Sequence, residues 1–278
     1  MRICKTIDEC RAARHKLPGS LGLVPTMGYL HDGHLALVAA SRAQNDHTAA
    51  SLFVNPTQFN NPADLEHYPR DEARDLRLFA ENGVDLLLMP PADEIYPPDF
   101  QTYVLVEKVA QGLEGEHRPG HFKGVATIVA KLFNIVQPDR AYFGQKDAQQ
   151  VAVIRQMARD LNMPVEVIVC PTVRESDGLA MSSRNARLSP EERRAAPVVF
   201  RALQAAQTLY QAGERHPDQL RAAMQTPLDA EKLAHVDYIS AADAESLQEL
   251  QAPSDNPTLL SLAVFFGETR LIDNLMLG

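Results

Sequence analysis

Cysteine is scarce in this chain of 278 residues. The three cysteines, Cys4, Cys10 and Cys170, form no C-x-x-C pair and leave an odd number. An odd count without paired spacing argues against a disulfide framework and against a zinc site built from thiolates. We therefore expect three free thiols.

Long apolar runs and an excess of basic residues are also lacking. No stretch approaches the roughly 18 consecutive apolar residues of a membrane-spanning helix, and Met1–Lys5 does not begin a secretory signal. The sequence thus predicts a cytoplasmic protein without a membrane partner. Acidic residues outnumber basic ones by 36 to 27, which gives a net charge of −9. Nucleic acid is not expected as a partner, because its binding depends mainly on basic side chains at phosphates.

Three common signatures of nucleotide or metal sites are absent too. No G-x-G-x-x-G follows a predicted strand, and neither G-x-x-x-x-G-K-[ST] nor H-E-x-x-H occurs. Dehydrogenases of the usual dinucleotide-binding kind, P-loop enzymes and zinc metalloproteases therefore lose their chief support.

What is present is an alternation of apolar runs and helical periodicity over the first 170 residues. Helices are expected at 7–15, from about 35, and at 70–82, 122–136 and 148–161, and strands at 21–24, 49–54, 84–89, 141–143 and 165–170. Such an alternation predicts an α/β fold, with a parallel sheet covered by helices and ligands at the carboxyl ends of its strands.

The pattern changes after residue 173, where we place a domain boundary. A polar segment at 174–187 leads to Ser189-Pro190-Glu191-Glu192, which predicts the start of a long alanine-rich helix. A second helix near 218–224 and strands at 236–239, 259–266 and 270–272 follow. Residues 174–278 are therefore expected to form a small α+β domain.

The most informative segment is Pro25-Thr26-Met27-Gly28-Tyr29-Leu30-His31-Asp32-Gly33-His34, between the first strand and its helix. It contains H-x-G-H, in which the two histidines fall on nearly the same side of a helix start. Free N–H groups at that helix start and two imidazole donors suit the phosphates of a nucleotide. The alternative is that both histidines are solvated or lie in the core.

Two further segments carry candidate phosphate ligands. Phe143-Gly144-Gln145-Lys146-Asp147 closes another predicted strand, so that its lysine could neutralise a phosphate and its aspartate could hold a ribose hydroxyl. Met181-Ser182-Ser183-Arg184-Asn185 offers two hydroxyls and a guanidinium, which suit pyrophosphate. The alternatives are a solvated turn that caps a helix and a plain polar loop.

Glutamines follow two of the predicted strands. Gln58 lies in Phe53-Val54-Asn55-Pro56-Thr57-Gln58-Phe59, and Gln149 and Gln150 follow the lysine segment. An uncharged amide can orient a small hydroxy acid without neutralising a carboxylate that must react. The alternative, which a single glutamine by itself favours, is an ordinary surface residue.

Taken together, these segments resemble the pantothenate synthetase family of the H-x-G-H nucleotidyltransferase superfamily. PTMGYLHDGH, FVNPTQF, YPR, RPGHFKGVATIVAKLFNIVQP, FGQKDAQQ and MSSRN occur in the family's order and spacing and cover most of residues 21–187. The resemblance implies a Rossmann-like nucleotidyltransferase domain at 1–173, a small α+β lid at 174–278 and a homodimer. It also implies an ATP-dependent condensation of pantoate with β-alanine through a pantoyl-adenylate, with Mg²⁺ carried by ATP.

The resemblance also implies roles for individual residues. The ATP-binding residues would be Met27, Gly28, Tyr29, Leu30, His31, Asp32, Gly33, His34, Gly144, Gln145, Lys146, Asp147, Val173, Met181, Ser182, Ser183 and Arg184. His34 would be the proton donor with His31 as its partner, while Lys146 and Arg184 would meet phosphate charge. Gln58 and Gln150 would bind pantoate, and Gln58 would also lie at the β-alanine position.

Some positions depart from the family's pattern. An acidic pair that lies near magnesium in some members corresponds here to Arg74-Asp75, so that only Asp75 could serve as a metal ligand. Gln145 and Ala148 replace a commoner glutamate and tyrosine.

Two rival functions stay open at this point. One is an H-x-G-H nucleotidyltransferase with a phosphorylated acceptor, which would need cations where this chain has glutamines. The other is a catalytically silent nucleotide-binding or scaffold protein, although simple ATP binding does not require both histidines.

Overall fold

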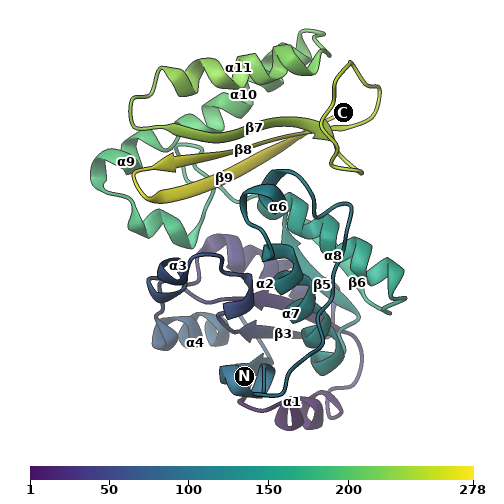
Figure 1. Ribbon diagram of the computed structural model, residues 1–278. Coiled ribbons are helices and arrows are strands. Elements are labelled where there is room, and N and C mark those ends of the chain that lie inside the picture. The colour runs from purple at the N-terminus through teal and green to yellow at the C-terminus, as the bar shows by residue number, and fades with distance from the viewer. The chain divides into compact units, whose positions relative to one another are not determined.

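The computed structural model describes residues 1–278, which form two compact units (Figure 1). The first comprises Met1–Gln145 and Gln150–Pro171, and the second comprises Lys146–Gln149 and Thr172–Gly278. The predicted domain boundary at residue 173 stays a prediction. The grouping of Lys146–Gln149 with the C-terminal part of the chain was not expected from the sequence.

The first unit is built on a six-stranded parallel sheet. Its strands are β1 (Arg2–Cys4), β2 (Leu21–Thr26), β3 (His47–Leu52), β4 (Leu86–Leu88), β5 (Arg140–Gly144) and β6 (Glu166–Cys170). They lie in the order β1-β4-β3-β2-β5-β6, and every neighbouring pair is parallel. The α/β fold class predicted from the alternation is confirmed.

Helices cover both faces of this sheet, because successive residues of each strand point to opposite sides. Its longer helices are α1 (Ile7–Arg14), α2 (Asp32–Gln44), α4 (Glu72–Glu81), α7 (His121–Val136) and α8 (Ala148–Asp160), and its short ones are α3 (Pro62–Glu66), α5 (Ala92–Ile95) and α6 (Leu113–His117). Leu21 and Leu23 of β2 join a core with α1, α7 and α8. Val24 joins a second core with α2 and α4.

The second unit packs helices against a three-stranded antiparallel sheet, as a small α+β domain requires. Its elements are α9 (Pro190–Ala195), α10 (Val198–Gln211), α11 (Pro217–Asp229), β7 (His235–Asp243), β8 (Thr258–Phe266) and β9 (Thr269–Leu277). Leu203 of α10, Met224 of α11 and Leu262 of β8 meet in its core. The single long helix predicted after Ser189 is wrong: Pro197, which has no N–H to donate, separates α9 from α10.

One further difference from the sequence prediction is the three-residue strand β1, which was not predicted, since so short a run carries no periodicity. Residues 102–106 form no strand, and the side chains of Tyr103 and Leu105 are exposed.

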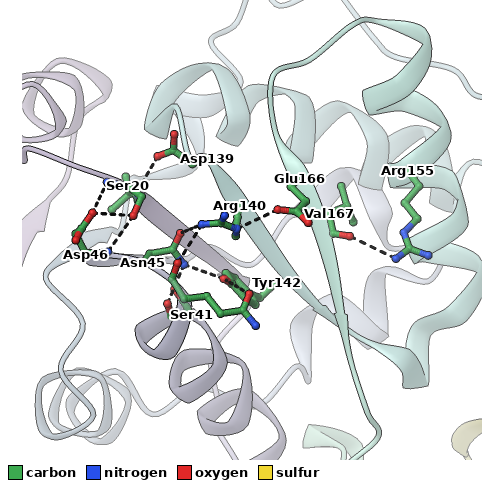
Figure 2. A network of polar contacts seen from close by, with 12 residues as sticks. Ser20, Ser41, Asn45, Asp46, Asp139, Arg140, Tyr142, Arg155, Glu166 and Val167 are labelled. Atoms are coloured by element: carbon green, nitrogen blue, oxygen red, sulfur yellow. Dashed lines mark hydrogen bonds and ion pairs between the residues drawn. The ribbon is translucent and has the colours of Figure 1, made fainter.

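A polar network holds the strands together where β2, β5 and β6 begin (Figure 2). Asn45 donates to the hydroxyl of Tyr142 at 2.8 Å, and Arg140 pairs with Glu166 at 3.0 Å. Gly22 is required beside it, because a Cβ there would lie 2.1 Å from the Ser41 hydroxyl. These contacts fix the amino ends of the strands, which leaves the carboxyl ends for a site.

No helix of the protein is long and apolar enough to cross a membrane. The three cysteines are free thiols, and all are buried. Burial raises the pKa of the Cys10 thiol to about 12, so that this group is a thiol at neutral pH.

Candidate active site

The strand order of the first unit reverses between β2 and β5. From β2 the chain continues to β3 on one side, whereas β5 pairs with the other side of β2 and is followed by β6. In open parallel sheets, ligands bind outside the carboxyl ends of the strands at such a switch point. The predicted H-x-G-H segment follows β2, and Gly144 is the last residue of β5, with Gln145 directly after it.

His31 and His34 lie together at the start of α2. His31 is the N-cap residue, and His34 is the third residue of the helix. The backbone N–H of His31 donates to Nδ1 of His34 at 3.3 Å, and the two ring centroids are 4.1 Å apart. Because Nδ1 of His34 accepts this bond, a neutral His34 carries its proton on Nε2. The prediction of two adjacent imidazoles at a helix start is confirmed.

The loop between β2 and α2 adopts an uncommon backbone conformation. Gly28 and Tyr29 both have positive φ angles, +88° and +52°. The N–H groups of Tyr29 and Leu30 donate to the carboxylate of Asp75 at 2.7 and 2.8 Å. These two N–H groups therefore point into the protein. The N–H groups of the helix start, which the sequence predicts to face a ligand, lie further along the chain.

The two hydrogen bonds to Asp75 also bear on whether this residue can bind magnesium. Asp75, the one acidic residue left at the position of the family's pair, is 1% exposed and has a backbone N–H on each carboxylate oxygen. The side chain is almost fully buried and each oxygen already accepts a backbone N–H, so the geometry opposes Asp75 as a magnesium ligand. No group of three or more His, Cys, Asp or Glu side chains is arranged to hold a metal ion.

Gln58 lies in the short helix η1 (Pro56–Gln58), directly after β3. Its carbonyl oxygen Oε1 accepts a 2.9 Å bond from Nδ2 of Asn55, and its Nε2 lies 3.2 Å from the sulfur of Met27. The Gln58 segment therefore contacts the segment that carries H-x-G-H. Since Asn55 donates to the amide oxygen and one N–H of Nε2 points to the Met27 sulfur, one amide N–H of Gln58 is left to bind a ligand.

The orientation of Asn55 is itself determined by its neighbours. Asn55 is 1% exposed, its Nδ2 also donates to the backbone carbonyl of Gly124 at 3.2 Å, and its Oδ1 accepts from the hydroxyls of Thr57 and Tyr96 at 3.0 and 2.8 Å. A carbonyl can only accept, so the NH₂ group of Asn55 must face Gly124. A Cβ on Gly124 would lie 2.4 Å from the Thr57 carbonyl oxygen, so α7 can approach η1 only because residue 124 is glycine.

Residues from the segment RPGHFKG hold the backbone of Gln58. His121 Nδ1 lies 2.8 Å from the Gln58 carbonyl oxygen, and an Arg118 N–H donates to the same oxygen at 3.4 Å. Sequence reasoning gave Asn55, Arg118 and His121 no part in holding Gln58. The signal that could have singled them out was their place inside two of the matching segments.

The remaining predicted site residues lie in the second unit. They are Lys146, Asp147, Val173, Met181, Ser182, Ser183 and Arg184. Met181 N–H donates to the Val173 carbonyl at 3.0 Å, and the hydroxyl of Ser182 caps η3 (Ser183–Arg187) by accepting from Arg184 N–H at 3.2 Å. Gln150, in contrast, belongs to the first unit with Gln58.

Comparisons with known proteins agree along the whole chain. The family model described as pantoate–beta-alanine ligase matches residues 2–276. A pantothenate synthetase of Roseiflexus castenholzii is 60% identical, with 100% of this chain and 99% of that protein covered. The crystal structure of pantothenate synthetase from Thermus thermophilus is 48% identical with a TM-score of 0.93, covering 99% of each chain. That of Francisella tularensis pantoate–beta-alanine ligase, complexed with beta-gamma ATP and beta-alanine, is 34% identical with a TM-score of 0.82, covering 99% of this chain and 97% of that one.

Proposed function

The chain belongs to the pantoate–β-alanine ligase family, and from this premise we propose how its own residues carry out the ATP-dependent condensation of pantoate with β-alanine. The reaction passes through a pantoyl-adenylate. The pantoate carboxylate attacks the α-phosphorus of ATP and pyrophosphate leaves. The amine of β-alanine then attacks the acyl carbon, which gives pantothenate and AMP.

The His31–His34 pair carries the adenylation step. Negative charge grows on the α-phosphate oxygens as the carboxylate adds, and donors that are already oriented stabilise such charge most. The bond from His31 N–H to Nδ1 of His34 places the proton of a neutral His34 on Nε2, the atom that would donate to the phosphate. This orientation is the single observation that carries the proposal. Lys146 would supply a second positive group, and Gly28, Gly33 and Gly144 would allow the nucleotide close to the backbone.

In this proposal the segment Met181–Arg184 binds the pyrophosphate group as it leaves. Two hydroxyls and one guanidinium match the charge and the acceptor oxygens of the leaving group. Asp147 and the backbone of Val173 would complete the nucleotide site. Mg²⁺ would arrive bound to the phosphates of ATP and would neutralise part of their charge.

Gln58 and Gln150 would hold pantoate. Because Asn55 occupies Oε1 of Gln58 and the Met27 sulfur takes one of the two N–H groups, the second N–H would face the ligand and bond a hydroxyl or a carboxylate oxygen. A neutral donor leaves the carboxylate its charge and hence its reactivity. The relative from Francisella tularensis has a structure with β-alanine bound, and we propose that β-alanine binds near Gln58 here.

The exchange of labelled pyrophosphate into ATP tests this proposal. Exchange should require pantoate and magnesium and should proceed without β-alanine, because adenylation precedes attack by the amine. Exchange that needs no pantoate would contradict the order of steps. Replacing pantoate by a phosphorylated acceptor such as phosphopantetheine should give no exchange, which separates this function from that of other H-x-G-H nucleotidyltransferases. A silent nucleotide-binding protein would give no exchange with either acceptor.

We further propose a cytoplasmic homodimer in which residues 1–173 form the Rossmann-like domain and 174–278 the lid. Tyr103 and Leu105 expose 45% and 66% of their surface, which is uncommon for large apolar side chains and supports their burial against a second copy. Light scattering should give about twice the 30.7 kDa mass of the chain. The variant Leu105→Glu should shift the protein toward monomer, whereas a monomeric wild type at high concentration would contradict the dimer.

A further inference from the structure

The loop that leads to the histidine pair has a conformation that it would not adopt by itself. Gly28 at φ +88° is followed by Tyr29 at φ +52°, and a non-glycine residue in the left-handed region needs support from its surroundings. Consecutive N–H groups in such a turn form a concave site for an anion. The anion that fills it here is the protein's own carboxylate, Asp75.

Asp75 fits this site closely. Oδ2 accepts the Tyr29 N–H at 2.7 Å and Oδ1 accepts the Leu30 N–H at 2.8 Å, so that each oxygen has one backbone donor. A Cβ on Gly28 would lie 2.9 Å from Oδ2 of Asp75 and 2.7 Å from a methyl group of Leu52. A side chain at position 28 would therefore clash with both residues, and glycine lets the loop lie this close to Asp75.

Arg74, the preceding residue of α4, holds the next peptide group, between Leu30 and His31. Its guanidinium donates to the Leu30 carbonyl at 2.8 Å and lies 5.8 Å from the centre of the Tyr29 ring. Two adjacent side chains of α4 thus bind both the N–H groups and the carbonyl of residues 29–30. The next residue is His31, whose N–H orients the ring of His34.

We propose that Asp75 is a positioning residue for the adenylation step: it holds the 28–30 loop, and through the backbone of His31 it sets the orientation of His34. The inference rests on the proposed role of the histidine pair. It replaces the metal role that the family's acidic pair suggested for this residue. An asparagine at position 75 would keep the shape of the side chain but would turn an NH₂ group toward one of the two N–H donors.

The test compares Asp75→Asn with Asp71→Asn, a matched change at the N-cap of the same helix that touches no residue of the loop. Single-turnover formation of pantoyl-adenylate at saturating ATP and pantoate should fall about 10- to 100-fold in Asp75→Asn, as expected for a displaced catalytic group. The rate of Asp71→Asn should stay that of the wild type. The magnesium concentration that gives half the maximal rate should be the same in all three proteins.

A folded Asp75→Asn protein that forms adenylate at the wild-type rate would overturn the proposal. So would a loss of rate that added magnesium restores, because that result would identify Asp75 as a metal ligand. If Asp75→Asn does not fold, Arg74→Met tests the support of the same loop, because it removes the hydrogen bond from α4 to the Leu30 carbonyl. It should slow adenylate formation without changing the magnesium requirement, and an unchanged rate would overturn the proposal.

One readout does not depend on activity. Nitrogen NMR of the imidazole rings should show His34 as the tautomer with its proton on Nε2 in the wild type, and a mixture of tautomers in Asp75→Asn. An identical His34 signal in both proteins would contradict the positioning role. A wild-type protein without pantoate-dependent exchange would instead contradict the proposed function, so the two failures are distinguishable.

Discussion

The side-chain amide of Asn274 donates a 2.8 Å hydrogen bond to the backbone carbonyl of Lys146, 128 residues earlier in the chain. Asn274 lies on β9, next to Asp273, whose buried carboxylate pairs with Arg174 at 2.5 and 3.0 Å. Burial raises the pKa of Asp273, while the adjacent Arg174 guanidinium opposes that rise. The last strand of the protein therefore anchors the segment that carries the proposed catalytic lysine.

Asn274→Ala should slow adenylate formation by about 2- to 10-fold, because a typical hydrogen bond contributes about 0.5–1.5 kcal/mol and its loss lets the Lys146 segment move. Single-turnover rates at saturating ATP would measure the effect. Met276→Ala, an exposed position on the same strand, is the control and should have the wild-type rate. An Asn274→Ala enzyme as fast as this control would show that Asn274 does not contribute to adenylate formation.

The orientation of Gln58 gives a second prediction. In Asn55→Asp the new carboxylate can still accept from Thr57 and Tyr96, but it cannot donate to Gln58 or to the Gly124 carbonyl. Gln58 should then rotate its amide and present its oxygen to pantoate. Losing this bond to a buried substrate costs about 1–3 kcal/mol, or about 5- to 150-fold in pantoate affinity.

Calorimetry with pantoate and, separately, with ATP would measure this effect. Pantoate should bind more weakly to Asn55→Asp and to Gln58→Ala, while ATP affinity should change little. Gln150→Ala should behave like Gln58→Ala if both glutamines hold pantoate. Unchanged pantoate affinity in all three variants would remove this pair of glutamines from the site.

Local patterns predicted most of the fold. The capping box of Thr6 and Glu9 and the apolar spacing of α2, α4, α7 and α8 depend on residues three or four apart, so they can be read from sequence. Pro197 is also a local signal, for a break between two helices, but the alanine-rich run led to the prediction of a single helix. The strand β1 depends on pairing with β4, more than 80 residues away, and has no local signal.

The residues of the candidate site likewise include some that could be predicted from sequence and some that could not. His31, His34, Gln58 and Lys146 could be proposed from strand ends and motifs, because side chains at the carboxyl edge of a parallel sheet meet. The residues that hold these side chains in place could not be predicted from strand ends or motifs. Asp75 reaches Leu30 across 45 positions of sequence, and a carboxylate that binds backbone N–H groups looks in sequence like one that binds a metal.

Asp243 provides a prediction about pH and the stability of the second unit. Its carboxylate accepts from the N–H and the hydroxyl of Ser246, both at 2.8 Å, and from Asn256 at 3.1 Å. The Ser246 N–H is the main cause that lowers the pKa of Asp243 below its usual 3.8. A pKa that is lower in the folded state stabilises the fold above the unfolded pKa and stops doing so as the pH falls through the folded one.

Asp243→Asn should therefore lower the free energy of unfolding by about 1 kcal/mol at pH 7, with a smaller difference at pH 3. Thermal unfolding of both proteins at the two pH values would measure the change. Asp255→Asn, in an exposed loop, is the control and should match the wild type. A difference between Asp243→Asn and wild type that is equal at both pH values would show that the charge of Asp243 does not contribute.

Lys146 gives the prediction that separates binding from catalysis. If its ammonium held only the phosphates of bound ATP, Lys146→Ala would raise the KM for ATP and leave the maximal rate nearly unchanged. We expect the rate itself to fall, because the α-phosphate oxygens gain charge as pantoate adds, and a fixed cation stabilises that change by about 3–4 kcal/mol. The corresponding loss is about 10²- to 10³-fold in adenylate formation. Single-turnover measurement at saturating ATP isolates this step from product release, with Lys16→Ala, at an exposed position, as the control. A Lys146→Ala enzyme that forms adenylate at the rate of this control would mean that the lysine serves only to bind ATP.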